Sequence, residues 1–297
     1  MIKQLAELVG EHNIHPCYPL KDCSSFGIGG EAKFFATPTS VHDLFNLIDF
    51  AEKNSIRFRV IGNGTNLLFS DNGFNGIVIS TQKLDEIEIL NENTFLVSAG
   101  TSLAKLIHHA YEEGLSGLEF AVGIPGTLGG AIVMNAGAGE SDISAVIKSV
   151  TILESGGIRV LEKESLKFSY RSSYFLSHPS AVILFAEIEL NRNYTKDEIK
   201  KRMQDNLERR NRTQPKKRSA GCVFKKCGET PAGYLIDQSG LKGKQIGGAR
   251  VSEIHANFIV NEGNASAKDV KKLIGLIETE VYKKYKKNLE LEIEIIE

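Results

Sequence analysis

Near its middle the chain reads Glu119-Phe-Ala-Val-Gly-Ile-Pro-Gly-Thr-Leu-Gly-Gly-Ala-Ile-Val-Met-Asn-Ala-Gly-Ala-Gly139, with six glycines among small and apolar residues. A flexible linker would contain Ser, Lys and Glu instead. Glycine in apolar surroundings indicates backbone that approaches another group closely, with dihedral angles that a Cβ would disfavour. Two interpretations fit this run equally well. It is a row of unpaired N–H groups that binds a pyrophosphate, or a buried tight turn between two core segments.

A second glycine loop, Ile61-Gly-Asn-Gly-Thr-Asn-Leu-Leu68, directly follows residues 57–61, whose alternation predicts a strand. It begins like a Rossmann fingerprint but lacks the third glycine and the helix that should follow, so it fails as a Rossmann site. It fits a second phosphate cradle, with donors from Gly62, Gly64, Thr65 and Asn66, or a plain glycine turn. Two such loops in one domain favour the cradle.

The composition is that of an ordinary globular protein. The 297 residues, 41% hydrophobic and 25% charged with a net charge of −1, predict two or three domains. This charge gives no long-range attraction to nucleic acid or to an anionic membrane. We expect a cytoplasmic protein, because no apolar run has the length of a membrane span and the N-terminus lacks a signal-peptide core. The spacing of the cysteines predicts free thiols rather than a zinc site: Cys17, Cys23, Cys222 and Cys227.

Hydrophobic periodicity predicts mixed α and β structure in which parallel strand pairing fits the order of elements. Helices are expected at 43–54 (with a Ser40-x-x-Asp43 capping box), 103–113, 196–211 and 267–287. Strands are expected at 57–61, 76–79, 94–98, 181–190, 255–261 and 289–296, with a hairpin formed by 146–153 and 158–161. The basic run 209–218 is either a solvated face or a site for a phosphorylated substrate.

Several of these pieces, in this order, resemble one enzyme family, the UDP-N-acetylenolpyruvoylglucosamine reductases of bacterial peptidoglycan synthesis. The N-terminal motifs are Ser25-Phe-Gly-Ile-Gly-Gly30, the loop 61–68, and Gly123-Ile-Pro-Gly-Thr-Leu-Gly-Gly-Ala131 followed by Met134-Asn-Ala-Gly137. The C-terminal motifs are Tyr170-Arg-Ser-Ser173, Ser219-Ala-Gly-Cys-Val-Phe-Lys225, His255-Ala-Asn-Phe-Ile-Val-Asn261 and the final Leu-Glu-x-Glu-Ile. The resemblance spans almost the whole chain, and the ordered set is far more specific than any single motif.

The resemblance implies an α+β fold with a two-part FAD-binding domain of the vanillyl-alcohol-oxidase type and a C-terminal α+β substrate domain. The corresponding ranges are 1–95, 96–200 and 201–288, with the terminal strand 289–297 near the active site. The family implies non-covalent FAD, NADPH as the reductant, a UDP-sugar substrate and a monomer. Only about 50 residues separate Arg171 from Cys222, which resembles the shorter subtype without an extra substrate-closing loop.

The resemblance also implies the roles of three residues. Hydride addition to C3 of an enolpyruvyl group places negative charge on C2 and its carboxylate, which needs a cation and then a proton donor. Arg171 matches the cation and Glu292 the second catalytic group, although alternation alone does not separate Glu292 from Glu290, Glu294 or Glu297. The family's usual proton donor is serine, and here it is Cys222. A thiol, with an ordinary pKa of about 8.5, is a stronger acid than an alcohol; the alternative is a small cysteine that only fills the core.

The resemblance further assigns binding residues and shows two departures. FAD is expected to contact residues of both glycine loops: Gly62, Asn63, Gly64, Thr65, Asn66, Gly123, Ile124, Pro125, Gly126, Gly129 and Gly130. Substrate is expected to contact Tyr170, Lys216, Lys217, Lys225 and Asn257. Lys226 stands where the family has asparagine, and Gly139 where it has tyrosine, so substrate affinity is expected to differ unless other side chains compensate.

Two other functions fit parts of the sequence. One is a sugar or alcohol oxidase of the same fold with covalently linked flavin, which the absence of His from both glycine loops disfavours. The other is a nucleotide-binding regulator without turnover. The first would stay yellow after denaturation, and the second would not be bleached by NADPH without oxygen.

Overall fold

The structure, a computed structural model, describes all 297 residues and divides into two compact units. Unit 1 comprises Met1–Pro16, Phe34–Asn63 and Gly76–Arg210, and unit 2 comprises Cys17–Lys33, Gly64–Asn75 and Asn211–Glu297. Each unit is therefore assembled from three separate stretches of chain. None of the helices combines the length and the apolar character needed to cross a bilayer.

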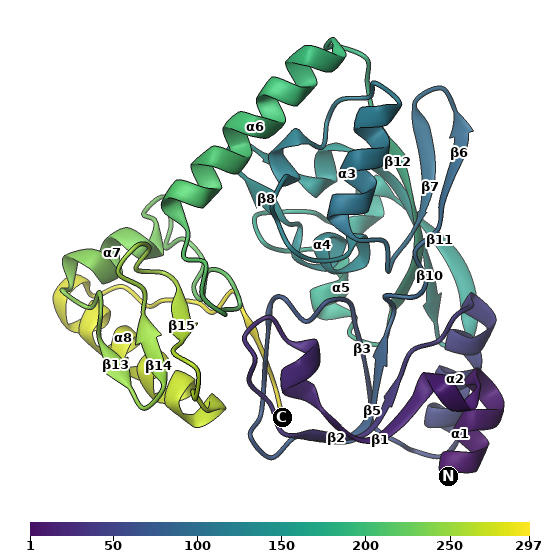
Figure 1. Ribbon diagram of the computed structural model, residues 1–297, viewed down its shortest axis with the longest axis horizontal. Helices are drawn as coiled ribbons and strands as arrows, with labels where there is room; N and C mark the ends of the chain where they lie inside the picture. Colours follow the sequence, from purple (N-terminus) through teal and green to yellow (C-terminus); the bar gives the residue numbers. More distant parts are fainter. The chain divides into compact units, whose positions relative to one another are not determined.

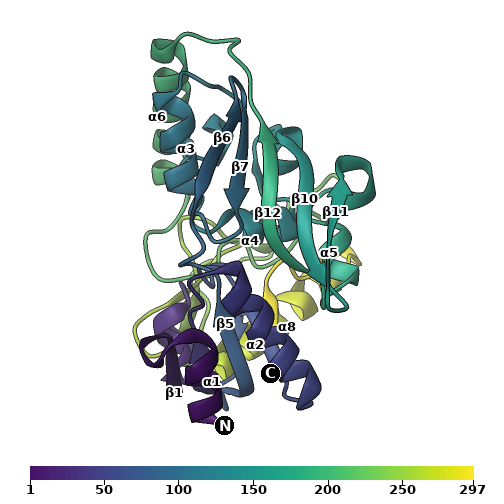
Figure 2. The same ribbon diagram turned by 90° about the vertical axis from the view of Figure 1, so that its right-hand side faces the viewer.

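An antiparallel five-stranded sheet forms much of unit 1, in the order β11-β10-β12-β7-β6 (Figure 2). Its strands are β6 (Ile87–Asn91), β7 (Thr94–Ser98), β10 (Ile147–Glu154), β11 (Gly157–Glu162) and β12 (Val182–Glu189). The predicted hairpin is confirmed, because Glu154 pairs with Gly157 and leaves a two-residue turn. Both turn residues, Ser155 and Gly156, have positive φ (51° and 71°), as in a type I′ turn.

Helices that lie between or after the strands of this sheet pack with it around one hydrophobic core. They are α3 (Leu103–Glu112), α4 (Leu128–Met134), α5 (Tyr174–Ser177) and the exposed α6 (Lys196–Thr213). In α3 the apolar residues recur on one face, so Leu103, Leu106, Ile107 and Ala110 are all buried. The core combines them with residues from the sheet and α4, among them Val97, Val150, Ile188, Leu128 and Ile132.

A second core of unit 1 lies beside a four-stranded sheet of order β1-β2-β5-β3. The strands are β1 (Ile14–Pro19), β2 (Glu31–Ala36), β3 (Phe58–Ile61) and β5 (Phe74–Ser80), and the helices are α1 (Ile2–Val9) and α2 (Val41–Lys53). The division between the units falls within β1, β2 and β5. Strands β3 and β5 are parallel, and the capping box of Ser40 and Asp43 starts α2, so both predictions are confirmed.

Unit 2 is a smaller α+β assembly. A three-stranded sheet of β13 (Gln245–Ile246), β14 (Ala249–Val251) and β15 (Ile259–Asn261) lies near α7 (Ala232–Gln238) and α8 (Ala267–Tyr285) (Figure 1). Its core takes Val270, Leu273 and Ile277 from the predicted stripe of α8. It also contains Phe26, Ile28 and Leu68, which come from far earlier in the sequence.

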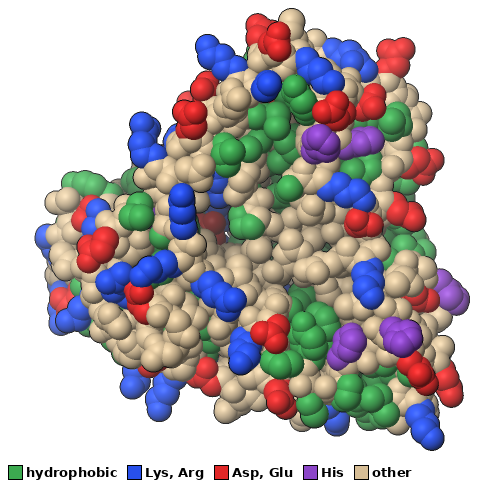
Figure 3. Space-filling model, in the orientation of Figure 1, with side chains coloured by type: hydrophobic (Ala, Val, Ile, Leu, Met, Phe, Trp, Pro, Cys, Tyr) green, Lys and Arg blue, Asp and Glu red, His purple; other side chains and the backbone are tan.

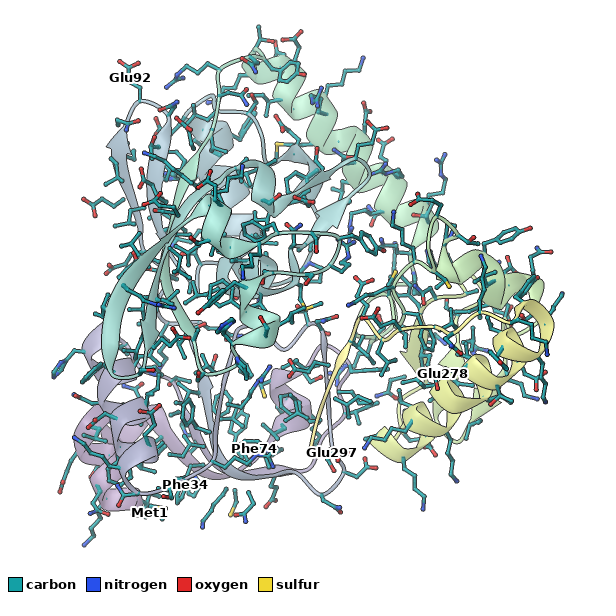
Figure 4. All side chains as sticks on the ribbon, turned by 180° about the vertical axis from the view of Figure 1, so that it is seen from behind. Met1, Phe34, Phe74, Glu92, Glu278 and Glu297 are labelled. Atoms are coloured by element: carbon teal, nitrogen blue, oxygen red, sulfur yellow. The ribbon has the colours of Figure 1, made fainter.

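The predictions of strands at 255–261 and 289–296 are largely wrong. Only Ile259–Asn261 and Glu294–Ile296 (β16) are regular, and β16 pairs in parallel with β4 (Leu67–Phe69). Residues 289–293 follow the irregular segment 223–225 instead, through bonds such as Lys225 N–H to Glu290 O (2.8 Å). The final residue, Glu297 (Figure 4), pairs with Lys271 of α8. The remaining elements are β8 (Gly137–Ala138), β9 (Ser141–Asp142) and 3₁₀ turns at Glu11–Asn13, Leu20–Cys23, Glu119–Ala121, Ile143–Ala145 and Lys163–Leu166.

Candidate active site

The first glycine run forms a short helix, which corrects one expectation. Thr127 caps α4, and its Oγ1 accepts the N–H of Gly130 at 3.3 Å. The N–H groups of Leu128 and Gly129 donate to Thr101 O and Ala99 O, each at 2.8 Å. The prediction of a row of unpaired donors is therefore wrong at residues 128–130. Glycine at 129 instead allows close packing, because a Cβ there would lie 3.0 Å from the Ala99 Cβ.

The two glycine loops meet within unit 1. A Cβ at Gly62 would lie 2.2 Å from Thr127 Oγ1, which is closer than two such atoms can approach. The backbone of Gly62, beside the half-buried Asn63, therefore lies directly against the cap of α4. Gly123 and Gly126 have φ of 75° and 139°, which favour glycine. Between them Ile124 packs on the core and precedes Pro125.

The remainder of the second loop belongs to unit 2. Gly64 has φ of 59°, and a Cβ there would lie 2.1 Å from Cys23 O. Ser25 binds this loop twice, through its N–H to Gly64 O (3.2 Å) and its Oγ to Thr65 O (3.4 Å). Burial raises the pKa of Cys23 to about 12, so this thiol stays protonated at neutral pH. The loop is thus held by the Ser25-Phe-Gly-Ile-Gly-Gly segment.

Three predicted residues, distant in the sequence, come together in unit 2. Glu292 donates its backbone N–H to Val223 O at 2.8 Å, next to Cys222. The carbonyl of Glu292 accepts the Asn66 side-chain N–H at 2.9 Å, and Asn66 O accepts the N–H of Glu294 at 2.9 Å. The backbone of Glu292 therefore lies next to both the glycine loop and the cysteine segment. All three side chains are half-buried.

Cys222 follows Gly221, which has space beside it, and precedes a segment that hydrogen bonds hold in place. A Cβ at the preceding Gly221 would meet no atom within 4 Å, so there is space beside the cysteine. Asn257, which is 6% exposed, holds the next residues. Its Oδ1 accepts the Phe224 N–H at 3.0 Å, and its Nδ2 donates to Phe224 O at 2.8 Å. Both ends of the Asn257 amide are thus engaged in positioning the cysteine segment, whereas the sequence suggested contact with substrate.

A half-buried histidine, His255, supports Asn257. His255 Nδ1 accepts the Asn257 N–H at 3.2 Å, and its ring lies edge-on to Phe258. Burial lowers the pKa of His255, which keeps the imidazole neutral near pH 7 and able to accept this bond.

We expect Asn257→Ala to destabilise the protein. It would leave two buried backbone groups of Phe224 without partners, at about 1–3 kcal/mol for each group. Urea titration followed by circular dichroism measures the change in the free energy of unfolding. Asn75→Ala, at an exposed position of β5, is the matched control. Equal stability of the two variants would contradict the role given to Asn257.

Arg171 lies in a two-residue turn of unit 1. Ser169 and Ser172 exchange backbone hydrogen bonds, both at 3.1 Å, and Arg171 has a φ of 52°. Its guanidinium donates to Asn135 O (Nη1, 3.3 Å) and Gly137 O (Nη2, 2.9 Å), just after the C-terminus of α4. The exposed Tyr170 ring lies 5.4 Å from the guanidinium carbon. Carbonyls at a helix C-terminus attract a cation, so the local fold orients this arginine.

The lysines predicted to bind substrate phosphates differ in their surroundings. Lys217 pairs with Glu262, which also binds Arg250 at 2.6 Å. Lys225, half-buried, pairs with Glu290 at 2.5 Å, whereas Lys216 is exposed. Acidic and basic side chains both occur over the face shown in Figure 3. Binding of a diphosphate by Lys217 or Lys225 would therefore require an exchange of partners.

The two residues that depart from the family pattern, Gly139 and Lys226, each lie near a charged side chain. Gly139 has φ of 69°, and a Cβ there would lie 3.5 Å from both Nη atoms of Arg209 in α6. The position taken by glycine thus lies against a guanidinium. Lys226 approaches the exposed Glu229 at 3.5 Å, and Glu229 lies in the turn that Cys227 and Thr230 close.

The residue that sequence reasoning missed is Asn135. It ends α4 in the left-handed conformation, with φ of 43° and ψ of 60°, and it is 2% exposed. A signal was present, because asparagine after an apolar helix and before small residues is typical of a left-handed helix end. Its side chain binds Ser169 in the turn of Arg171, and also Asp142 and Ser144, which follow in the chain.

Two family models match separate parts of the chain. Residues 32–161 match the family model of an FAD binding domain, and residues 214–296 match that of the C-terminal domain of UDP-N-acetylenolpyruvoylglucosamine reductase. The second match lies entirely within unit 2.

Two curated relatives and one solved structure have this same enzyme name. The UDP-N-acetylenolpyruvoylglucosamine reductase of Caldanaerobacter subterraneus subsp. tengcongensis is 42% identical, with 100% of this chain and 98% of the relative covered. That of Bacillus subtilis is 41% identical, with 94% and 92% covered. The crystal structure of the enzyme from Thermus caldophilus aligns with a TM-score of 0.82 and 36% identity, covering 94% of this chain and 97% of that one.

Proposed function

Because the chain belongs to the UDP-N-acetylenolpyruvoylglucosamine reductase family, we propose that it reduces UDP-N-acetylglucosamine enolpyruvate to UDP-N-acetylmuramate with NADPH. The observation that supports this most directly is the convergence in unit 2. Asn66 of a glycine loop binds the backbone of Glu292, and Glu292 binds Val223 beside Cys222. The backbone segments that carry the proposed cofactor loop, proton donor and carboxylate are thus adjacent in unit 2.

The backbone of the glycine loops fits a dinucleotide cofactor. Glycine occurs at position 62, where the two loops approach each other. It also occurs where φ is positive, at Gly64, Gly123 and Gly126. We propose that these residues hold the FAD diphosphate together with Asn63, Thr65, Asn66, Ile124 and Pro125. Gly129 and Gly130 support the loop through the fold of α4. When bound, FAD would carry electrons from NADPH to C3 of the enolpyruvyl group.

The protein's own residues are then proposed to stabilise the developing negative charge and to supply the proton for C2. Arg171, oriented by the carbonyls of Asn135 and Gly137, is proposed to bind the substrate carboxylate as negative charge develops. Cys222 donates its proton to C2, which completes the saturated product. Glu292 is proposed to act at the carboxylate end, where a shared proton would let it donate a hydrogen bond. Tyr170, Lys216, Lys217 and Lys225 remain the proposed substrate contacts.

The three-part division at residues 95 and 200 is part of the same proposal. Three separate hydrophobic clusters, two in unit 1 and one in unit 2, support the number of parts. They do not follow the boundaries, because Phe26 and Leu68 enter the cluster of unit 2 and Val182 enters the cluster beside the four-stranded sheet. A monomeric state, a cytoplasmic location, non-covalent FAD and a role in cell-wall synthesis likewise stay predictions.

An anaerobic titration tests the function directly. The purified protein should be yellow, lose its colour with NADPH, and regain it on addition of UDP-N-acetylglucosamine enolpyruvate. Colour that persists in the denatured chain would indicate covalent flavin, as in the oxidases. Failure of NADPH to bleach the flavin would indicate a regulator, and failure of the substrate to restore the colour would exclude the proposed reaction.

We expect Gly62→Ala to weaken FAD binding. The backbone of Gly62 does not have positive φ, so the added methyl group acts through its clash with Thr127. Overpacking typically costs about 1–3 kcal/mol. If this strain displaces the loop that binds FAD, the affinity falls by about 5- to 140-fold. Flavin fluorescence titration of the apoprotein measures it.

Gly157→Ala is the control for this prediction. Gly157 also lacks positive φ, and its nearest contact for a Cβ is Glu154 O at 3.9 Å. It should bind FAD like the unmodified protein. Gly62→Ala with unchanged affinity would show that the contact between the two loops is unimportant for the cofactor.

A further inference from the structure

The side chain of Asn135 connects the turn that carries Arg171 to the loop that supplies its acceptors. Asn135 Nδ2 donates to Ser169 O at 2.9 Å, at the start of the turn. The same nitrogen donates to Asp142 Oδ2 at 3.1 Å, and Oδ1 accepts the Ser144 N–H at 3.2 Å. These last two bonds close residues 135–144, which include Gly137. One buried amide therefore holds both the arginine turn and one of the carbonyls that the arginine binds.

The other end of the turn is fixed to the same helix. Ser173 Oγ donates to Val133 O at 2.7 Å and caps α5 through the Phe175 N–H at 3.3 Å. Arg171 itself is in the left-handed region, where an arginine is strained and needs its surroundings to hold it. Asn135 thus both fixes the turn and contributes a carbonyl to the guanidinium.

From this geometry we infer that Asn135 is a positioning residue for Arg171 in the reaction with substrate. The inference rests on the proposed function, because it requires Arg171 to meet the substrate carboxylate. Asn135 acts through Arg171. Loss of its side chain should misplace the guanidinium while leaving electron transfer from NADPH untouched. A misplacement of about 1 Å at a reacting group costs on the order of 100-fold in rate.

The first variant is Asn135→Gly, because glycine adopts the left-handed conformation without strain and removes only the side-chain bonds. The rate of flavin reduction by NADPH and the rate of reoxidation by UDP-N-acetylglucosamine enolpyruvate are measured separately by anaerobic stopped flow. We expect normal reduction and reoxidation slowed about 100-fold. If Asn135→Gly binds no FAD, Asn135→Asp serves. It keeps the shape and the acceptor, removes the donors to Ser169 and Asp142, and adds the repulsion of a second carboxyl group beside Asp142. Ser155→Gly, which also replaces a left-handed residue, is the matched control and should be normal in both steps.

A double-mutant cycle separates positioning from general loosening. If Asn135 acts through Arg171, then Asn135→Gly should have almost no further effect once Arg171→Ala is present. Slowing of reoxidation by the same factor in both backgrounds would overturn the inference. So would Asn135 variants that reoxidise at the normal rate while Arg171→Ala is slow. Normal reoxidation by Arg171→Ala would instead refute the proposed role of Arg171, and the inference would fall with it.

Discussion

Cys222→Ala is expected to reduce its flavin with NADPH at the normal rate and to reoxidise it with substrate about 10²–10⁴-fold more slowly, the usual contribution of a general acid. The reason is that Cys222 is the proposed proton donor to C2 and takes no part in the first half of the cycle. Anaerobic stopped-flow absorbance of the flavin measures the two steps separately. Loss of both steps would indicate damage to the fold instead.

Two further variants sharpen this test. Cys222→Ser restores the donor that the family resemblance implies and should reoxidise far faster than Cys222→Ala. Cys227→Ala removes another half-buried thiol of unit 2, whose Sγ donates to Asn288 O at 3.5 Å, and should leave both rates unchanged. A Cys222→Ala enzyme that turns over normally would show that this cysteine only fills space.

Arg171→Ala should produce the second large effect, a loss of about 10²–10³-fold in substrate-driven reoxidation, as for removal of a group that stabilises developing negative charge. Lysine is expected to restore little, because a compact ammonium cannot bind both carbonyls and a carboxylate as a planar guanidinium fork does. The measurement is the reoxidation rate against substrate concentration.

Arg159→Ala is the control for Arg171. Arg159 is an exposed arginine of β11 that pairs with Glu154 at 2.5 Å and donates to Tyr174 Oη at 2.7 Å. Its replacement should change neither rate. If Arg171→Ala reoxidises as fast as Arg159→Ala, the carboxylate of the substrate is bound by another group.

Sequence reasoning succeeded where local signals decide the structure. The capping box of α2 and the stripes of α3 and α8 were recognisable because the periodicity of a helix is repeated over several turns. The hairpin at Ser155-Gly156 was predictable because few residues tolerate its dihedral angles.

Sequence reasoning failed where a partner that is distant in the sequence decides the local structure. The alternation of residues 289–296 is typical of a strand, yet only the last three residues find a strand partner, in β4. The glycine run was expected to expose N–H groups, but carbonyls of Ala99 and Thr101 take two of them. Neither partner is near in sequence, so no local pattern reveals it. The same holds for the bonds that join Asn66, Glu292 and Val223.

The discontinuity of unit 2 has a consequence for biosynthesis. Phe26 and Leu68 leave the ribosome early, but the apolar residues that enclose them come from beyond residue 220. These side chains stay uncovered while most of the nascent polypeptide is made, since a core forms only once its members are available. β16, which pairs with β4, is translated later still. A chain that terminates prematurely before residue 294 would therefore lack this strand, and should be a substrate for chaperones and proteases rather than a slower enzyme.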